Sequence, residues 1–163
     1  MFTIFKFILG KLEDINHIWS TTTTDFKTFT PSKLYYSTTG EDDIDATLLH
    51  DTDNNEWIMF IKDLTDKYIN MVKSKTLDGP WGPPTKNLTP KYLCEGPTSM
   101  RIGKYYHLYF DIYHDNRIGL VRSTDLIHWE DMTSHIKFPP KAKHGTIFKV
   151  TPDMVKMISK AGL

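Results

Sequence analysis

Asp45, Glu95 and His144 stand at nearly equal intervals along the chain, 50 and 49 residues apart. Each belongs to a short run, and the three runs are Ile44–Thr47, Glu95–Thr98 and His144–Ile147. If these runs are equivalent strands of a repeated unit, two carboxylates and one imidazole point toward a common axis. Such a set can transfer protons, bind a metal ion, or do both.

The two carboxylates could act in the cleavage of a sugar. Two carboxyl groups close together in a partly desolvated funnel do not both ionise readily, so one of them keeps a proton at neutral pH. A protonated carboxyl beside a sugar is a general acid for glycosidic cleavage. Glu95 has the longer reach and suits the acid, whereas Asp45 tunes it. A structural role stays open for each residue: Asp45 could end the acidic turn that precedes it, and His144 could be a buried core histidine.

The rest of the chain repeats with a similar period. Thr22–Phe29 resembles Arg122–Trp129 at a distance of 100 residues, and Ser74–Trp81 lies halfway between them. Glu56–Asp63 matches Lys104–Asp111 with an offset of 48 residues. A period near 50, made of short strands with turns between them, is typical of propeller blades. The recurring Trp57, Trp81 and Trp129 are then core residues between blades, and the recurring Asp63 and Asp111 are structural.

These patterns predict an all-β fold, one partial β-propeller domain over residues 1–163. Residues 2–9 and 17–23 are expected to form strands of an incomplete first blade, residues 44–85 a second blade and residues 94–133 a third. Residues 143–150 are expected to open a fourth blade. Thr151 before Pro152 is a helix start, and a short terminal helix should end near Gly162.

Composition narrows the function classes. The 20 basic and 20 acidic residues cancel, so nothing indicates binding to nucleic acid or to an anionic membrane. Cys94 is the single cysteine, which excludes an internal disulfide, and we interpret it as a small buried hydrophobic residue. No apolar run is long enough to span a membrane, and the apolar start of the chain lacks the features of a signal peptide, so the cellular compartment stays unknown.

Arg117 follows a loop and could reach a ligand hydroxyl or carboxylate.

Several runs, in the right order, resemble glycoside hydrolase family 43, the arabinofuranosidase and β-xylosidase group. They are Ile44–Thr47, Glu95–Thr98, the Phe110–Tyr113 run, Ser123–Trp129 and Lys143–Ile147. The resemblance implies a five-bladed propeller that hydrolyses arabinose- or xylose-containing glycans with inversion. It assigns the acid to Glu95 and the acid-tuning aspartate to Asp45. It also implies that His144 holds a calcium or other ion in the central channel through water, with no cofactor required.

The chain departs from the family pattern at the general base. That aspartate lies in an Asp-Pro pair of the family's first blade, and this sequence contains no Asp-Pro pair. Five blades of about 50 residues need roughly 250 residues, so we expect about three and a half blades and a missing N-terminal blade. Asp14 and Asp25 could be proposed as substitutes, but neither falls at a channel position of the repeat.

Three functions therefore stay open. The first is an impaired family 43-like hydrolase, whose base is absent or supplied from elsewhere. The second is a carbohydrate-binding remnant without turnover. The third is an assembly module. Open strand edges and blade faces promote association, so we also expect self-association or a partner chain that completes the propeller.

Overall fold

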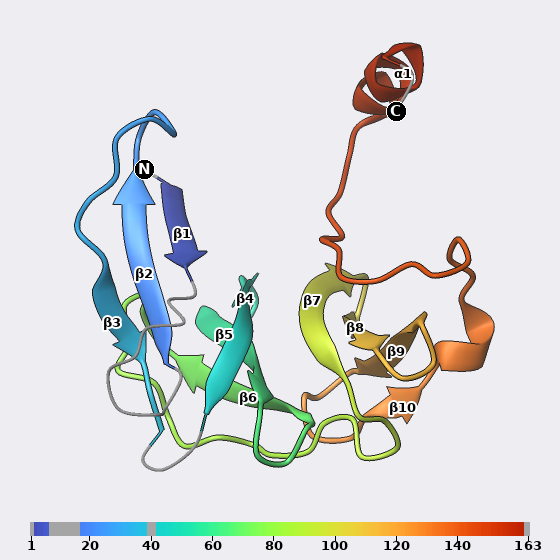
Figure 1. Ribbon diagram of the computed structural model, residues 1–163, viewed down its shortest axis with the longest axis horizontal. Helices are drawn as coiled ribbons and strands as arrows, with labels where there is room; N and C mark the ends of the chain where they lie inside the picture. The colour runs from blue at the N-terminus through green and yellow to red at the C-terminus, as the bar shows by residue number, and fades with distance from the viewer. Residues whose placement is uncertain (1, 7–16, 39–41, 162–163) are drawn as a thin grey trace.

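The described residues form ten short strands in three antiparallel sheets (Figure 1). The computed structural model describes residues 2–6, 17–38 and 42–161. The first sheet contains β1 (Phe2–Lys6), β2 (Ile18–Thr23) and β3 (Lys33–Tyr36). The second contains β4 (Asp43–Asp51), β5 (Glu56–Asp63) and β6 (Ile69–Ser74), and the third contains β7 (Glu95–Ile102), β8 (Tyr105–Ile112), β9 (Arg117–Ser123) and β10 (Glu130–Asp131). A 3-10 turn over Thr133–His135 and the helix α1 (Pro152–Lys160) complete the elements.

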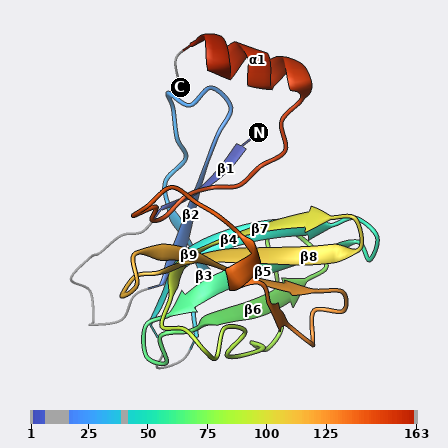
Figure 2. The ribbon, with the colours of Figure 1, turned by 90° about the vertical axis from the view of Figure 1, so that its right-hand side faces the viewer.

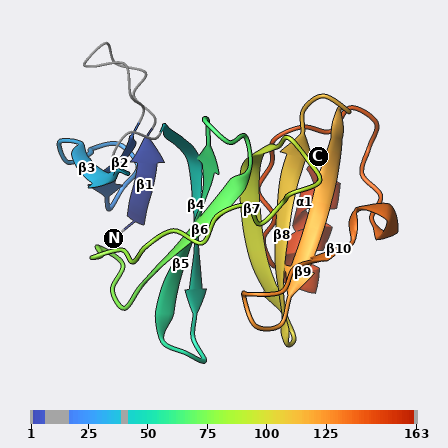
Figure 3. The same ribbon diagram turned by 90° about the horizontal axis from the view of Figure 1, so that it is seen from below.

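The three sheets stand side by side in chain order, with their faces packed together (Figure 3). Two apolar cores lie between them. One joins Ile18 and Tyr36 of the first sheet to Met59 and Ile61 of the second. The other joins the second sheet to the third through Ile58, Phe60, Leu108, Phe110 and neighbouring residues. The all-β class is confirmed, and each sheet depends on the next one to bury its apolar face.

The turns that repeat at 100 residues have the same hydrogen bonds. Asp25 Oδ1 accepts from the backbone N–H of residues 27 and 28, and Asp125 Oδ1 accepts from residues 127 and 128. Phe26 and Leu126, which follow these aspartates, share a positive φ of 56° and 61°. The backbone hydrogen bonds hold the pKa of the exposed Asp25 at about 2. Asp25 is therefore a turn residue in this structure, and Asp14 lies outside the described residues.

The hairpin registers correct the 48-residue offset. Ile44 pairs with Lys62 in the second sheet, whereas Glu95 pairs with Asp111 in the third. Lys62 and Asp111 therefore occupy equivalent positions, 49 residues apart, and Asp63 is not the equivalent of Asp111. Because neighbouring strand residues point to opposite faces, a shift of one residue moves a side chain to the other side of the sheet.

The expected strand over residues 143–150 is wrong. Those residues form an extended segment with no strand pairing, and their backbone touches β7 through the Ile147 N–H, which donates to Thr98 Oγ1 over 3.2 Å. Among the described residues no strand forms a backbone ladder with this segment. The strand expected over 17–23 is confirmed as β2, and β1 covers the described part of 2–9. β3 was not anticipated.

The helix start is confirmed: Thr151 caps α1, and its Oγ1 accepts from the Met154 N–H over 3.2 Å. The helix ends at Lys160, and Gly162 lies outside the described residues. All helical residues are exposed, and α1 stands apart from the sheets at the end of the extended segment (Figure 2). Over the described residues, no helix combines the length and apolar character that crossing a bilayer requires.

Asp51 connects the second and third sheets. Its carboxylate is fully buried and accepts from Arg101 Nη1 at 2.9 Å, from the Tyr106 hydroxyl at 2.7 Å and from Asn54 Nδ2 at 2.7 Å. Burial acts to raise the pKa of Asp51, but the hydrogen bonds from Asn54 and Tyr106 outweigh it, and the net shift is downward. Removing one member of a buried charged network leaves its partners without compensation.

We expect Asp51→Ala to lower the free energy of unfolding at pH 7 by about 3–5 kcal/mol. Because the folded-state pKa is depressed, the carboxylate stabilises the protein above the unfolded-state value near about 4 and loses this effect as the pH falls. Urea unfolding at pH 7 and at about pH 3 should therefore show a smaller gap between wild type and variant in acid. Asp53→Ala is the matched control, since Asp53 pairs with the same Arg101 at an exposed position. Equal decreases in the free energy of unfolding of Asp51→Ala and Asp53→Ala would contradict the role of Asp51 in connecting the two sheets.

Candidate functional site

Asp45 is turned out of its strand by a β-bulge. The register of β4 against β5 shifts between Ile44 and Thr47, and Asp45 within the shift has a positive φ of 53°. β7 has the same irregularity after Glu95, where Gly96 has a φ of 56°. A bulge bends the strand and redirects the extra side chain. The Asp45 carboxylate thereby crosses to the next sheet, where Oδ2 accepts from the Gly96 N–H over 3.0 Å.

The structure brings together the three residues that the spacing singled out. His144 Nε2 lies 3.5 Å from Asp45 Oδ2 and 3.9 Å from Glu95 Oε1. One ligand atom from each of the three residues lies within 4.8 Å of the others. Asp45 and Glu95 come from the adjacent strands β4 and β7, whereas His144 comes from the extended segment, where a strand was expected. The side chains of all three remain partly exposed, so a ligand can reach them.

Gly96 provides the surface on which the His144 ring rests. A Cβ atom at this position would lie 2.8 Å from His144 Nε2 and in closer conflict with Cδ2. The positive φ of Gly96 also disfavours any side chain. The positive φ therefore favours glycine at this bulge, and the close approach of the imidazole requires it.

Asp111 is the residue that the sequence analysis missed. Its side chain is fully buried, and Oδ2 lies 3.3 Å from His144 Nδ1. Neither carboxylate oxygen has an aligned hydrogen bond. The two ring nitrogens of His144 thus face carboxylates on both sides, Asp111 at Nδ1 and the Asp45 and Glu95 pair at Nε2. The incorrect offset, which grouped Asp111 with Asp63, hid this position.

Lys62 is a second unanticipated charge beside the site. Its side chain is buried, and Nζ donates to the carbonyl oxygen of Cys94, directly before Glu95, over 2.6 Å. Burial lowers the pKa of this ammonium group, while the nearby Glu95 and Asp45 carboxylates act to raise it. Lys62 therefore fixes the backbone from which Glu95 projects and places a cation near the acidic pair.

Cys94 and Arg117 lie outside the cluster. Burial raises the pKa of the Cys94 thiol to about 11, and Sγ is 3.0 Å from Thr89 Oγ1, which agrees with a buried, unreactive residue. Arg117 pairs with Asp115 at 3.1 Å, and its guanidinium lies 5.9 Å from the centre of the Tyr92 ring. A contact between Arg117 and a substrate stays a prediction.

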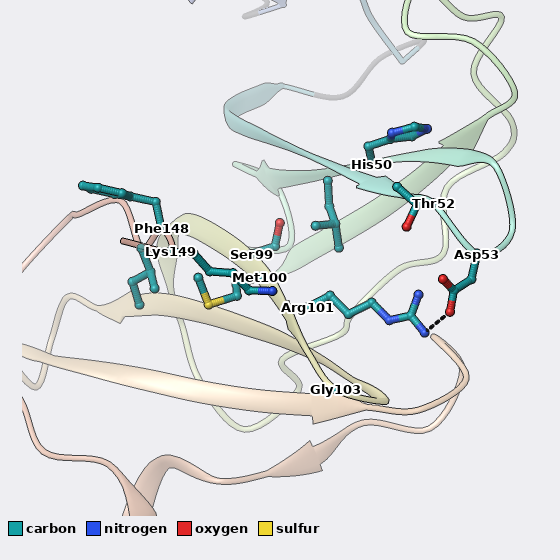
Figure 4. A pocket seen from close by; sticks show the side chains of 11 residues that line it. His50, Thr52, Asp53, Ser99, Met100, Arg101, Gly103, Phe148 and Lys149 are labelled. Carbon is teal, nitrogen blue, oxygen red and sulfur yellow. Dashed lines mark ion pairs between the residues drawn. The ribbon is translucent and has the colours of Figure 1, made fainter. Parts of the chain in front are cut away.

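A hollow of about 520 Å³ lies at the opposite end of β4 and β7 from Asp45 and Glu95 (Figure 4). It is lined by the ends of these strands and by residues 147–149 of the extended segment. Arg101 reaches across it to Asp53, and their ion pair measures 2.6 Å. Because this arginine is already paired with two aspartates, the hollow carries no unpaired charged cluster comparable to the one around His144.

The cluster around His144 is suited to proton transfer at a polar ligand. Two partly exposed carboxylates lie within 4.8 Å of each other, and the imidazole beside them can donate a proton to a ligand or accept one from it. Carboxylate oxygens also suit a hard divalent cation, and imidazole is a common ligand of transition metals, so the donors fit an ion as well. The chemistry is that of an acid–base or ion-binding centre, and no nucleophile and base pair of the serine or cysteine type is part of it.

The chain is similar to a known sequence family and to several solved structures. Residues 10–155 match the sequence family described as a probable glycosyl hydrolase domain related to family 43. No curated protein matches the chain. Among solved structures, a thermostable family 43 glycoside hydrolase superposes with a TM-score of 0.59 at 14% identity, over 79% of this chain and 49% of that one.

Two further solved structures share the fold. A family 43 β-1,3-galactosidase gives a TM-score of 0.53 at 21% identity, over 70% of this chain and 25% of that one. An exo-β-1,3-galactanase from Clostridium thermocellum gives 0.51 at 16% identity, over 75% and 29%. The chain thus spans a quarter to a half of the length of these structures. By the match over residues 10–155, the chain belongs to the family 43-related glycosyl hydrolase domains.

Proposed function

We propose that this chain contributes the acid half of a glycoside hydrolase site, within part of a five-bladed propeller. Glu95 protonates the leaving oxygen of a glycosidic bond, and Asp45 tunes Glu95 through its charge. The observation that carries the proposal is the convergence of Asp45, Glu95 and His144 from two neighbouring sheets and the segment that follows them. Cleavage proceeds with inversion, as in the family that the sequence resembles, and inversion requires a second carboxylate that activates water.

The proposed substrates are arabinose- or xylose-containing glycans, with Arg117 contributing a substrate contact. β-1,3-linked galactose is the second candidate, because solved structures with the same fold include a β-1,3-galactosidase and exo-β-1,3-galactanases. A panel of pentosides and galactosides therefore separates the two substrate classes.

The general base is proposed to come from outside this chain, either from another blade or from a partner chain, because the chain contains no Asp-Pro pair. Without that base, turnover by this chain alone should be weak. No cofactor is required by the proposal. A calcium or other ion held through water at His144 would hold the neighbouring carboxylates in place, and the donors around His144 support such an ion.

A carbohydrate-binding or assembly function is the alternative from another class. The missing Asp-Pro pair favours it, since a site with an acid but no base can retain sugar contacts without turnover. The buried Asp111 and Lys62 favour the hydrolase, because charges are costly to bury without a use.

We expect the purified chain to release arabinose or xylose slowly from α-L-arabinofuranosyl or β-D-xylosyl oligosaccharides, whose sugar leaving groups need protonation. Glu95→Gln should lower kcat by about 10²–10⁴-fold. A β-D-galactoside in the same assay tests the second substrate class. Glu130→Gln is the matched control, since Glu130 is exposed and pairs with Arg122 on β9, away from the cluster.

The outcomes of this assay are distinct. An equal decrease of kcat in Glu95→Gln and Glu130→Gln would contradict the role of Glu95 as the general acid. The wild type could instead fold but show no turnover on any of the three sugars. A higher melting temperature in the presence of arabinose or xylose oligomers would then favour the binding function.

We also expect self-association. Phe148, Val155 and Met157 are exposed by 62%, 48% and 70%, and the formal net charge of zero provides no long-range repulsion between copies. Sedimentation velocity should show a species that grows with concentration. Met157→Glu should weaken association by about tenfold or more, because burial of one such side chain contributes roughly 1.5–3 kcal/mol.

Lys160→Glu serves as the control for added negative charge on the same helix. A monomer at all concentrations would exclude association between copies, and a partner chain would then be sought by mixing with further blades of the same fold.

A further inference from the structure

We propose that Asp111 is the positioning residue of His144: it holds a proton on Nδ1 of the imidazole and thereby presents Nε2 to Asp45 and Glu95. Asp111 does not reach the substrate side of the cluster, because its side chain is fully buried beneath the ring. Its effect on the reaction passes through His144.

The first support is the burial of an acid without other partners. Asp111 has no exposed side-chain surface, and neither oxygen has an aligned hydrogen bond. An ionised carboxylate in such a place needs a donor or a cation close by. His144 Nδ1, at 3.3 Å from Oδ2, is the one basic side-chain nitrogen beside the Asp111 carboxylate among the described residues.

The second support is the way in which the ring is confined. Gly96 lies against the ring at Nε2, Cδ2 and Cγ, so the imidazole cannot move toward β7. Nε2 faces Asp45 at 3.5 Å and Glu95 at 3.9 Å. Because the ring is held between Gly96 and Asp111, the hydrogen bond at Nδ1 determines whether Nε2 carries a proton. A carboxylate behind a histidine orients the ring and raises its basicity in many metal and catalytic sites.

The third support is the contrast between equivalent positions. The residue that occupies the place of Asp111 in the second sheet is Lys62, which bonds to a backbone carbonyl instead of to a histidine. A residue needed only for the fold of the blade would have similar chemistry in both sheets. The opposite charges indicate that each residue serves its own neighbour in the cluster.

The direct test is the imidazole nitrogen spectrum of ¹⁵N-labelled protein, with the His144 signals assigned from their loss in His144→Gln. In the wild type we expect Nδ1 of His144 to have the shift of a protonated nitrogen. Asp111→Asn keeps an acceptor oxygen and should retain this shift, whereas Asp111→Leu should lose it. His128, whose Nδ1 lies 2.7 Å from Asp125 Oδ2 on the surface, provides an internal reference that neither variant changes.

Two further variants test whether Gly96 confines the His144 ring. Gly96→Ala should displace the ring and change both His144 signals, whereas Gly103→Ala carries a similar positive φ of 58° with open space around it and should leave them unchanged. An unprotonated Nδ1 in the folded wild type would overturn the proposal whatever the variants do. Unchanged His144 signals in a folded Asp111→Leu protein would also overturn it.

The consequence for catalysis rests on the proposed function, and the two can fail separately. If the wild type hydrolyses a pentoside, Asp111→Leu should lower kcat by roughly 10- to 100-fold with a smaller change in KM, and Asp111→Asn should restore part of it. If the wild type shows no turnover, the proposed hydrolase fails, but the nitrogen spectrum still decides whether Asp111 positions His144.

Discussion

The candidate site depends on one hydrogen bond between sheets, from the Gly96 N–H to the Asp45 carboxylate. It exists because β4 and β7 each break their ladder with a bulge at the same place, one with Asp45 and the other with Gly96 at positive φ. The first bulge points a carboxylate at the neighbouring strand, and the glycine at the second lacks the Cβ that would clash with the His144 ring. This contact holds Glu95, the residue before Gly96, beside Asp45, and leaves space for His144 above the glycine.

The spacing of residue types singled out Asp45, Glu95 and His144, but the equivalence behind it is wrong. The residue of β7 at the place of Asp45 is Gly96, and His144 lies on no strand. The period could not show that Asp111 and Lys62 occupy equivalent positions beside the cluster. The hairpin between β4 and β5 has four connecting residues, Thr52–Asn55, whereas the hairpin between β7 and β8 has two, Gly103–Lys104. Matching the aromatic residues of β5 and β8 gave an offset of 48, while the registers give 49. In a strand, an error of one residue exchanges the two faces.

The fold was predictable where local sequence determines it and less so where packing does. The turns at Asp25 and Asp125 share a side-chain acceptor and a residue with positive φ, so their likeness could be read from the sequence. The Thr151 cap could be read for the same reason. The segment around Ile147 has the composition of a strand, but no described strand pairs with it, and a strand without a ladder leaves its backbone groups unsatisfied. Its hydrogen bond to Thr98 is made by a side chain instead.

The charges around the cluster explain why it can hold several acids at close range. Asp45, Glu95 and Asp111 bring three carboxylates to one place, and a group of this kind is unfavourable unless positive groups or protons offset it. Lys62 lies on one side, through the carbonyl before Glu95, and the imidazole of His144 lies between the acids. At the same register position, the second sheet therefore supplies the buried basic side chain of Lys62 and the third sheet supplies the buried acidic side chain of Asp111. Glu95 lies between them, and its environment is set by both.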